Sequence, residues 1–290
     1  MLELIGGIVM GFGGSVPGVS GGTIAFLMGF FDEMIDSINA FVSKGSQNRK
    51  KAFFFLLRLG IGLVIGLIGA TLLITAFFEA HIHAVSSLFI GVTLFSVPLV
   101  IYEERQTLKG KYLQALWILP GAALIVGIVL LASLGFNVSS NVLQIVMAFP
   151  AGIFSACAMI MPGISGASIL YIFGLYTTFY NDVHAFLKFD FSGIVFLIVF
   201  GVGMLVGALG VVKGIKWLLS NRRASTIYAI LGMMLGSIYS IVVGPSTLDP
   251  PQANIDFSNF NWLFFAIGAL IIAAFEGLKL LIEKKKAKKK

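Results

Sequence analysis

The chain has 290 residues, of which 58% are hydrophobic and 11% charged, and its mean hydropathy is +0.99. Soluble domains carry about a quarter charged residues, so this composition excludes a soluble globular protein and indicates a membrane protein with several spans. The formal net charge is +7, but the lysines and arginines fall mostly in short loops and at the C-terminal end. That distribution is typical of membrane topology and argues against nucleic-acid binding.

The first apolar region, residues 4–40, is interrupted by Pro17 and Gly18. Residues 4–16 are too few to cross a bilayer, because about 20 are needed. We therefore expect two half-helices that form a re-entrant hairpin and return to their starting side. Full crossing by both parts is the alternative, and it leaves the topology of the remaining chain unchanged. The predicted spans that follow are 53–78, 85–102 and 113–134.

The second half of the chain has the same order of elements. A second broken region, 142–181, precedes spans expected at 192–216, 225–243 and 262–282, and a lysine-rich tail ends the chain. The predicted fold class is an all-α polytopic membrane protein with two inverted repeats, residues 1–137 and 138–290. Each repeat consists of a broken re-entrant helical hairpin and three transmembrane helices.

A repeated motif marks the two broken regions. Pro17-Gly-Val-Ser-Gly-Gly-Thr-Ile24 recurs as Pro162-Gly-Ile-Ser-Gly-Ala-Ser-Ile169, 145 residues later and half of the 290-residue chain. The match continues through Gly29 and Gly174. Glycines at 60, 62, 66 and 69 in the next span recur with the same spacing at 201, 203, 207 and 210. The chain is therefore a duplication, and we expect these eight glycines to pack helices closely in lipid.

The basic residues predict the orientation. A hairpin plus three spans crosses the membrane an odd number of times, so the second repeat is inverted relative to the first. The loops then place 17 of the 20 lysines and arginines on one face, which the positive-inside rule makes cytoplasmic. Both termini are expected in the cytoplasm and Lys188 outside.

The motif predicts an anion site. A half-helix that begins near Ser20 leaves backbone N–H groups unpaired, and its dipole favours negative charge. Glycines in such breaks allow a ligand to approach the backbone, and hydroxyl groups add donors. Breaks at corresponding positions of two repeats indicate the binding site of a transporter. The alternative is that these residues only stabilise a kink and pack helices. The candidate anion-binding residues are Ser20, Gly21, Gly22, Thr23, Ser165, Gly166, Ala167 and Ser168.

Two charged residues inside predicted spans have open roles. Arg58 can bind a phosphate with both arms of its guanidinium, or it can reach to the membrane interface. Glu276 can couple transport to protons, or it can pair with Arg58 or Lys279. His81 and His83 are expected in an outer loop, where with Glu79 they form at most a weak metal site, so no metal or other cofactor is expected.

The two motifs carry a resemblance to a known family. PGVSGGTIAFLMGFFDEM and PGISGASILYIFGLY are similar to those of a bacterial membrane family, formerly a domain of unknown function, now regarded as polyprenyl-phosphate translocases. The resemblance covers nearly the whole chain. It implies a lipid transporter, not an enzyme, that moves undecaprenyl phosphate or a related polyprenyl phosphate from the outer to the inner leaflet of the cytoplasmic membrane. The implied role is recycling of this lipid for cell-wall peptidoglycan synthesis, with protons or sodium ions as candidate coupling ions.

Two other functions remain open at this stage. A small-anion channel or exchanger also uses helix ends rich in glycine, serine and proline. A lipid-phosphate phosphatase would need a nucleophile with a base, or a metal cluster, at membrane depth, and the residues favour it least. The expected partners are the lipid substrate and membrane lipids, and the sequence leaves the oligomeric state open.

Overall fold

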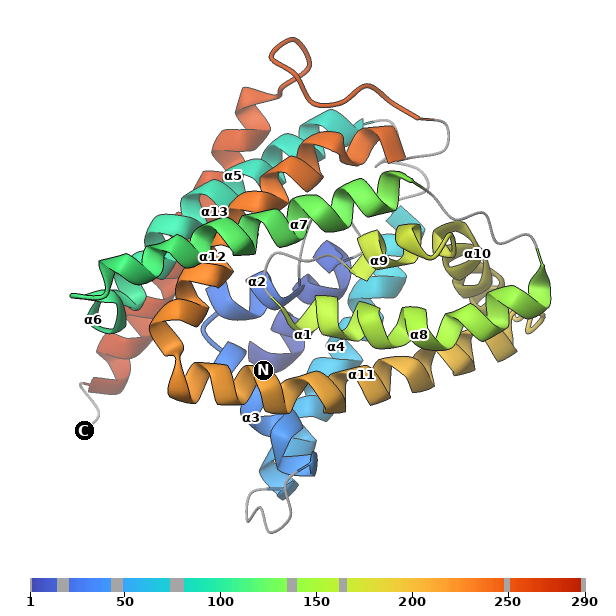
Figure 1. Cartoon of the computed structure of the whole chain (residues 1–290), viewed down its shortest axis with the longest axis horizontal. Helices are drawn as coiled ribbons and strands as arrows, with labels where there is room; N and C mark the ends of the chain where they lie inside the picture. The colour runs from blue at the N-terminus through green and yellow to red at the C-terminus, as the bar shows by residue number, and fades with distance from the viewer. Residues whose placement is uncertain are drawn as a thin grey trace.

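The computed structural model describes residues 2–14, 21–42, 49–73, 81–134, 140–161, 166–247 and 251–287, which form helices and turns without any strand (Figure 1). The helices of the first half are α1 Leu2–Gly14, α2 Gly21–Leu27, α3 Phe31–Val42, α4 Arg49–Leu73, α5 Ile82–Glu103, α6 Arg105–Leu108, η3 Tyr112–Trp117 and α7 Ile118–Ser133. Those of the second half are α8 Asn141–Ile160, α9 Gly166–Ile172, α10 Tyr176–Leu187, α11 Ile194–Asn221, α12 Arg223–Val243, η4 Gly244–Thr247 and α13 Trp262–Ala287.

Six helical segments among the described residues are long and apolar enough to cross a membrane: Arg49–Ala70, Ile82–Glu103, Tyr112–Leu131, Asn141–Ile160, Ile194–Asn221 and Arg223–Ser246. The chain is thus an all-helical membrane protein with several spans over these residues. Five of the segments correspond to predicted spans, and the predicted span 262–282 lies within α13. The remaining one is α8, which was predicted as part of a hairpin. Its 20 residues measure about 30 Å, whereas the 13 residues of α1 measure only about 20 Å.

The helices α1 and α4 lie side by side along a seam of glycines. A Cβ added at Gly7 or Gly11 of α1 would overlap a backbone oxygen of α4, and one added at Gly62 or Gly66 would overlap a backbone oxygen of α1. Small residues let helix backbones approach this closely, which strengthens packing where lipid supplies no hydrophobic drive. Residues later in α1 contact residues later in α4, so the two helices run in the same direction. The chain between them therefore returns to the end from which α1 starts.

The same arrangement recurs between α8 and α11. A Cβ at Gly152, Gly203 or Gly207 would overlap a backbone oxygen of the partner helix, and these two helices also run in the same direction. The prediction that all eight duplicated glycines pack helices is wrong for half of them. A Cβ would meet no atom within 4 Å at Gly60, Gly69, Gly201 and Gly210. These four lie on other faces of their helices, and sequence spacing alone does not show which face turns toward a partner.

The remaining spans pair across the two halves of the chain. The helix α5 packs along α13, and α7 packs along α12 (Figure 1). Close glycine contacts again form the seams, with Gly91 against Phe265 and Gly232 against Ile118. Each half therefore supplies one helix to each of these two pairs. The halves are interlocked and do not form separate bundles.

Each broken region contains the same turn. Gly29 and Gly174 have positive φ angles of 72° and 65°, which glycine adopts without steric cost. The amide of Phe30 donates to Ala25 O at 3.1 Å, and that of Leu175 donates to Leu170 O at 2.9 Å. A hydrogen bond that closes a six-residue turn, with a glycine in the left-handed conformation, is the Schellman ending of a helix. The turn joins a 7-residue helix, α2 or α9, to a 12-residue helix, α3 or α10.

The main apolar core lies between the first broken region and α12. The buried residues Met34 and Ile35 of α3 belong to the same cluster as Ile227, Leu231 and Met234 of α12. Among the six long apolar helices, α12 is the most deeply buried. The first broken region packs against the second half through α3 on α11 and α2 on α8, and α12 shares the same core.

Candidate functional site

The starts of α2 and α9 both lie against the C-terminal turns of α8. A Cβ added at Gly21 would lie 3.6 Å from the backbone oxygen of Met159, and one added at Gly166 would lie 3.7 Å from its side chain. The sequence motif is thus brought together from two segments 145 residues apart. Both helix starts leave backbone N–H groups without intrahelical partners.

The other motif residues fall in two groups. Gly22, Thr23 and Ser168 are buried within the first turns of α2 and α9, and Ala167 lies in α9. Ser20 and Ser165, which were predicted to supply hydroxyl donors, lie outside the described residues. One hydroxyl that the sequence did not single out is at the site, because Ser155 Oγ of α8 donates to Gly166 O at 3.4 Å.

An apolar cavity of about 240 Å³ leads to the start of α9. Its walls come from α1, α4, α8, α9, α10 and α11, so both halves of the chain contribute. Apolar side chains and glycines form nearly all of the lining, with Gly166 and Gly14 at the motif end. The polar lining residues are Ser155 and Tyr180, and no charged residue lines it. Such a cavity suits a hydrocarbon chain attached to a group held at the helix starts.

The structure does not bring Arg58 to these helix starts. Its guanidinium lies 4.0 Å from the carboxylate of Glu3, and its side chain is 56% exposed. Glu3 is in the first turn of α1, and the motif follows the other end of that helix, about 16 Å away by helical rise. The phosphate-binding role of Arg58 stays a prediction, as does the alternative that Arg58 reaches to the membrane interface.

The remaining candidates are dispersed. Glu276 lies in α13, but its side chain is outside the part of the chain that the structure describes in atomic detail. His83 Nε2 lies 2.9 Å from Ala253 O and ties the start of α5 to the segment before α13. Among the described residues, no group of three or more His, Cys, Asp or Glu side chains is placed to hold a metal ion.

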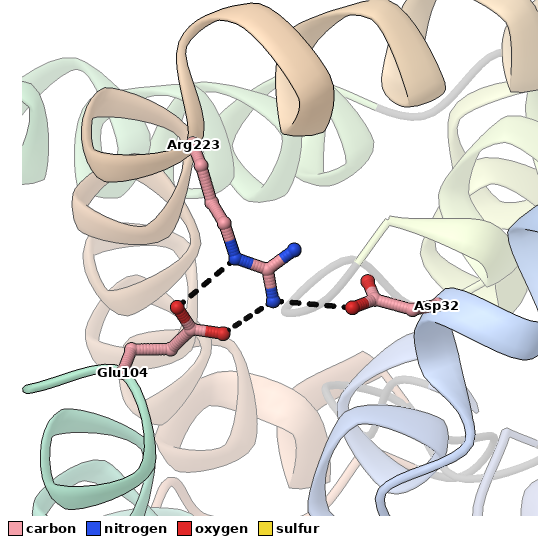
Figure 2. A network of polar contacts seen from close by, with 3 residues as sticks. All are labelled: Asp32, Glu104 and Arg223. Atoms are coloured by element: carbon pink, nitrogen blue, oxygen red, sulfur yellow. Dashed lines mark hydrogen bonds and ion pairs between the residues drawn. The ribbon is translucent and has the colours of Figure 1, made fainter. Parts of the chain in front are cut away.

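A charge network joins the two halves at one end of the molecule. Arg223, at the start of α12, binds both carboxylate oxygens of Glu104 and lies 3.1 Å from Asp32 of α3 (Figure 2). Burial raises the pKa of the Glu104 carboxyl, but the hydrogen bonds from Arg223 and Thr107 and the charge of Arg223 outweigh it, so the pKa lies below its ordinary value.

A second and a third ion pair lie beside this network. Lys216 of α11 pairs with Asp36, and Lys51 of α4 pairs with Glu33. These ion pairs were not predicted from the sequence. The only available signal was the segregation of basic residues to one predicted face.

Comparisons with known proteins agree with the motif resemblance. Residues 10–256 match the family described as undecaprenyl phosphate translocase-like. A polyprenyl-phosphate transporter of Vibrio cholerae serotype O1 is 32% identical over 252 residues, covering 83% of this chain and 77% of the relative. A polyprenyl-phosphate transporter of Staphylococcus aureus is 28% identical over 274 residues, covering 93% of this chain and 94% of the relative. No solved structure matches the chain.

Proposed function

The chain belongs to the undecaprenyl phosphate translocase-like family, and we propose from this membership that it transports a polyprenyl phosphate across the bacterial cytoplasmic membrane. The substrate is undecaprenyl phosphate or a close relative, moved from the outer to the inner leaflet for reuse in envelope synthesis. The observation that carries the proposal is the similarity, over most of the chain, to two proteins named polyprenyl-phosphate transporters.

The phosphate is held where α2 and α9 begin. A bare phosphate cannot cross hydrocarbon, because an unpaired charge there costs many kcal/mol. The protein must replace its hydration with donors, and two helix starts supply backbone N–H groups without a permanent charge. That neutrality assists release, because a transport site must also let its ligand go. The nearness of Gly21 and Gly166 to Met159 supports this assignment.

The isoprenyl tail lies in the apolar cavity between α1, α4, α8 and α11 and leaves it sideways into lipid. Support comes from the lining, which is almost entirely hydrocarbon and ends at Gly166. The tail therefore needs no enclosed tunnel. Only the headgroup has to be shielded during the crossing.

The two repeats are inverted in the membrane, and both termini are cytoplasmic. The common direction of α1 and α4, and of α8 and α11, supports a return of each broken region to its starting side. The ion pairs of Arg223, Lys216 and Lys51 join residues that the charge rule assigns to the same cytoplasmic face. Rocking of one helix group against the other then opens the headgroup site to each leaflet in turn, with Glu276 as a candidate coupling residue for protons or sodium ions.

The decisive experiment measures lipid movement and ion movement with the same purified protein in liposomes. The proposal predicts protein-dependent movement of undecaprenyl phosphate between leaflets, without chloride flux and without release of inorganic phosphate. Chloride flux alone would favour the anion-channel alternative, and phosphate release would favour the phosphatase.

Substitutions at the helix starts test the site itself. Gly21→Val and Gly166→Val should abolish lipid movement, because branched side chains crowd the backbone groups that contact the headgroup. A Cβ at Gly166 makes only ordinary contacts of 3.6 Å or more, and one at Gly21 lies 3.3 Å from the flexible end of the Met10 side chain, so both variants should fold, as size-exclusion chromatography can verify. Ser20→Ala and Ser165→Ala should cost less, about 1–3 kcal/mol in binding. Normal lipid movement in either valine variant would show that the headgroup site lies elsewhere.

A further inference from the structure

A second cavity lies at the end of α8. It has a volume of about 290 Å³ and lies between α3, η3, α11 and α12, with Met161 in its wall. Met161 is the last residue before the second motif, and Met159, two residues earlier, lines the apolar cavity described above. The two cavities therefore meet the same end of α8, with Met159 in the wall of one and Met161 in the wall of the other.

The polar lining of this second cavity differs from that of the first. Arg222, Ser225 and Thr226 line one part, and apolar side chains such as Trp117 and Leu218 line the rest. No acidic residue contributes to the lining. The cavity thus combines the positive charge of Arg222 with largely hydrocarbon walls, which matches an amphiphilic anion.

Arg222 and Arg223 are neighbours with opposite environments. Arg223 is neutralised by Glu104 and Asp32 (Figure 2). The exposed guanidinium of Arg222 makes no hydrogen bond or ion pair with any other residue that the structure describes. The hydroxyl protons of Ser225 and Thr226 are already used, because Ser225 Oγ donates to Gln114 Oε1 at 3.1 Å and Thr226 Oγ1 donates to Arg222 O at 2.9 Å. The cavity therefore holds a cation that has no acidic partner among the residues that the structure describes.

We propose that this cavity is a second headgroup site, which takes the phosphate of an isoprenyl monophosphate on the cytoplasmic side before release. The inference rests on the proposed transport function and deepens it. Arg222 binds the phosphate oxygens with its planar fork, and Trp117 and Leu218 cover the first isoprene units. Ligand pockets usually measure about 300–1,000 Å³, so a cavity of this size holds the headgroup end only, and the rest of the tail lies in lipid.

Trp117 provides a direct measurement. The chain has three tryptophans, and Trp217→Phe with Trp262→Phe leaves Trp117 as the single reporter. Titration of the detergent-solubilised protein with farnesyl monophosphate should give a saturable change in Trp117 emission. Farnesol, which lacks the phosphate, and inorganic phosphate, which lacks the tail, should each bind far more weakly. Equal responses to phosphatidylglycerol and farnesyl monophosphate would overturn the assignment, because they would indicate a general anionic-lipid site.

Arg222→Gln should weaken farnesyl monophosphate binding by about 10- to 100-fold, the range for a lost hydrogen bond between charged groups. The affinity of Arg222→Lys for farnesyl monophosphate should lie between those of Arg222→Gln and the parent protein. Lysine keeps the positive charge but lacks the planar guanidinium that binds two oxygens at once. The matched control is Arg105→Gln, which removes the same charge from a residue that stacks on Tyr102 outside this cavity. Equal affinities in Arg222→Gln and Arg105→Gln would overturn the inference.

Transport measurements separate this inference from the proposed function. If Arg222→Gln binds and flips lipid normally while Gly166→Val flips none, the second site is refuted and the transport proposal stands. If farnesyl monophosphate binds in an Arg222-dependent way but the parent protein flips no lipid phosphate, the site is supported and the transport proposal fails.

Discussion

Replacement of Gly207 by alanine tests the close approach of α8 and α11. An added Cβ would overlap Ile153 O and lie 2.8 Å from Ile153 Cα. Carbon atoms in contact prefer about 3.5–4.0 Å, so the two helices must separate locally by roughly 0.7 Å or more. Overpacking of this kind costs about 1–3 kcal/mol of unfolding free energy.

Gly210→Ala is the matched control on the same helix. A Cβ there meets no atom within 4 Å. Both substitutions gain the same helix propensity, up to about 1 kcal/mol, so the difference between the two variants isolates the overlap. We expect Gly207→Ala to be less stable than Gly210→Ala by about 1–3 kcal/mol.

Unfolding by sodium dodecyl sulfate in mixed micelles, followed by circular dichroism, measures this difference. The same comparison in the first half uses Gly66→Ala, where a Cβ would overlap Ile8 O, and Gly69→Ala, where it would meet nothing within 4 Å. Coincident unfolding curves for the two members of each pair would refute the packing of α1 on α4 and of α8 on α11.

Arg58→Lys is expected to retain transport in the liposome assay, because the exposed arginine pairs with Glu3 and lysine can make the same pair. A severe loss of transport would instead indicate that Arg58 binds the phosphate. Glu104→Gln should lower stability at neutral pH by about 1–2 kcal/mol, less than for a fully buried pair. Since the pKa of Glu104 is lowered from 4.5, this contribution is present above that value and lost as the pH falls through the folded-state pKa. Melting temperatures of parent and variant should therefore converge in acid, and a gap that stays constant would contradict the ion-pair account. In a Cys157→Ala background, a cysteine at the exposed position 188 should react with an impermeant reagent from outside, and one at position 109 only after permeabilisation; equal labelling of both would reject the predicted topology.

The sequence by itself determined the features that depend on short stretches of chain. Long apolar runs predict membrane helices because about 20 residues are needed to cross the bilayer, and five of the six long apolar helices agree with predicted spans. The repeated motif identified the two breaks, and Gly29 and Gly174 do form matching turns, because a left-handed helix ending is set by a few neighbouring residues. The family also followed from the motifs, since they are local patterns.

Only the tertiary structure decided which surfaces meet. The rotation of each helix selects Gly62 and Gly66 for the seam and turns Gly60 and Gly69 away, although their spacing in the sequence looks equivalent. The pairing of α5 with α13 and of α7 with α12 depends on contacts between segments more than a hundred residues apart, which no local pattern encodes. The same long-range packing places Arg58 beside Glu3, locks Arg223 between Glu104 and Asp32, and leaves the charge of Arg222 at a cavity.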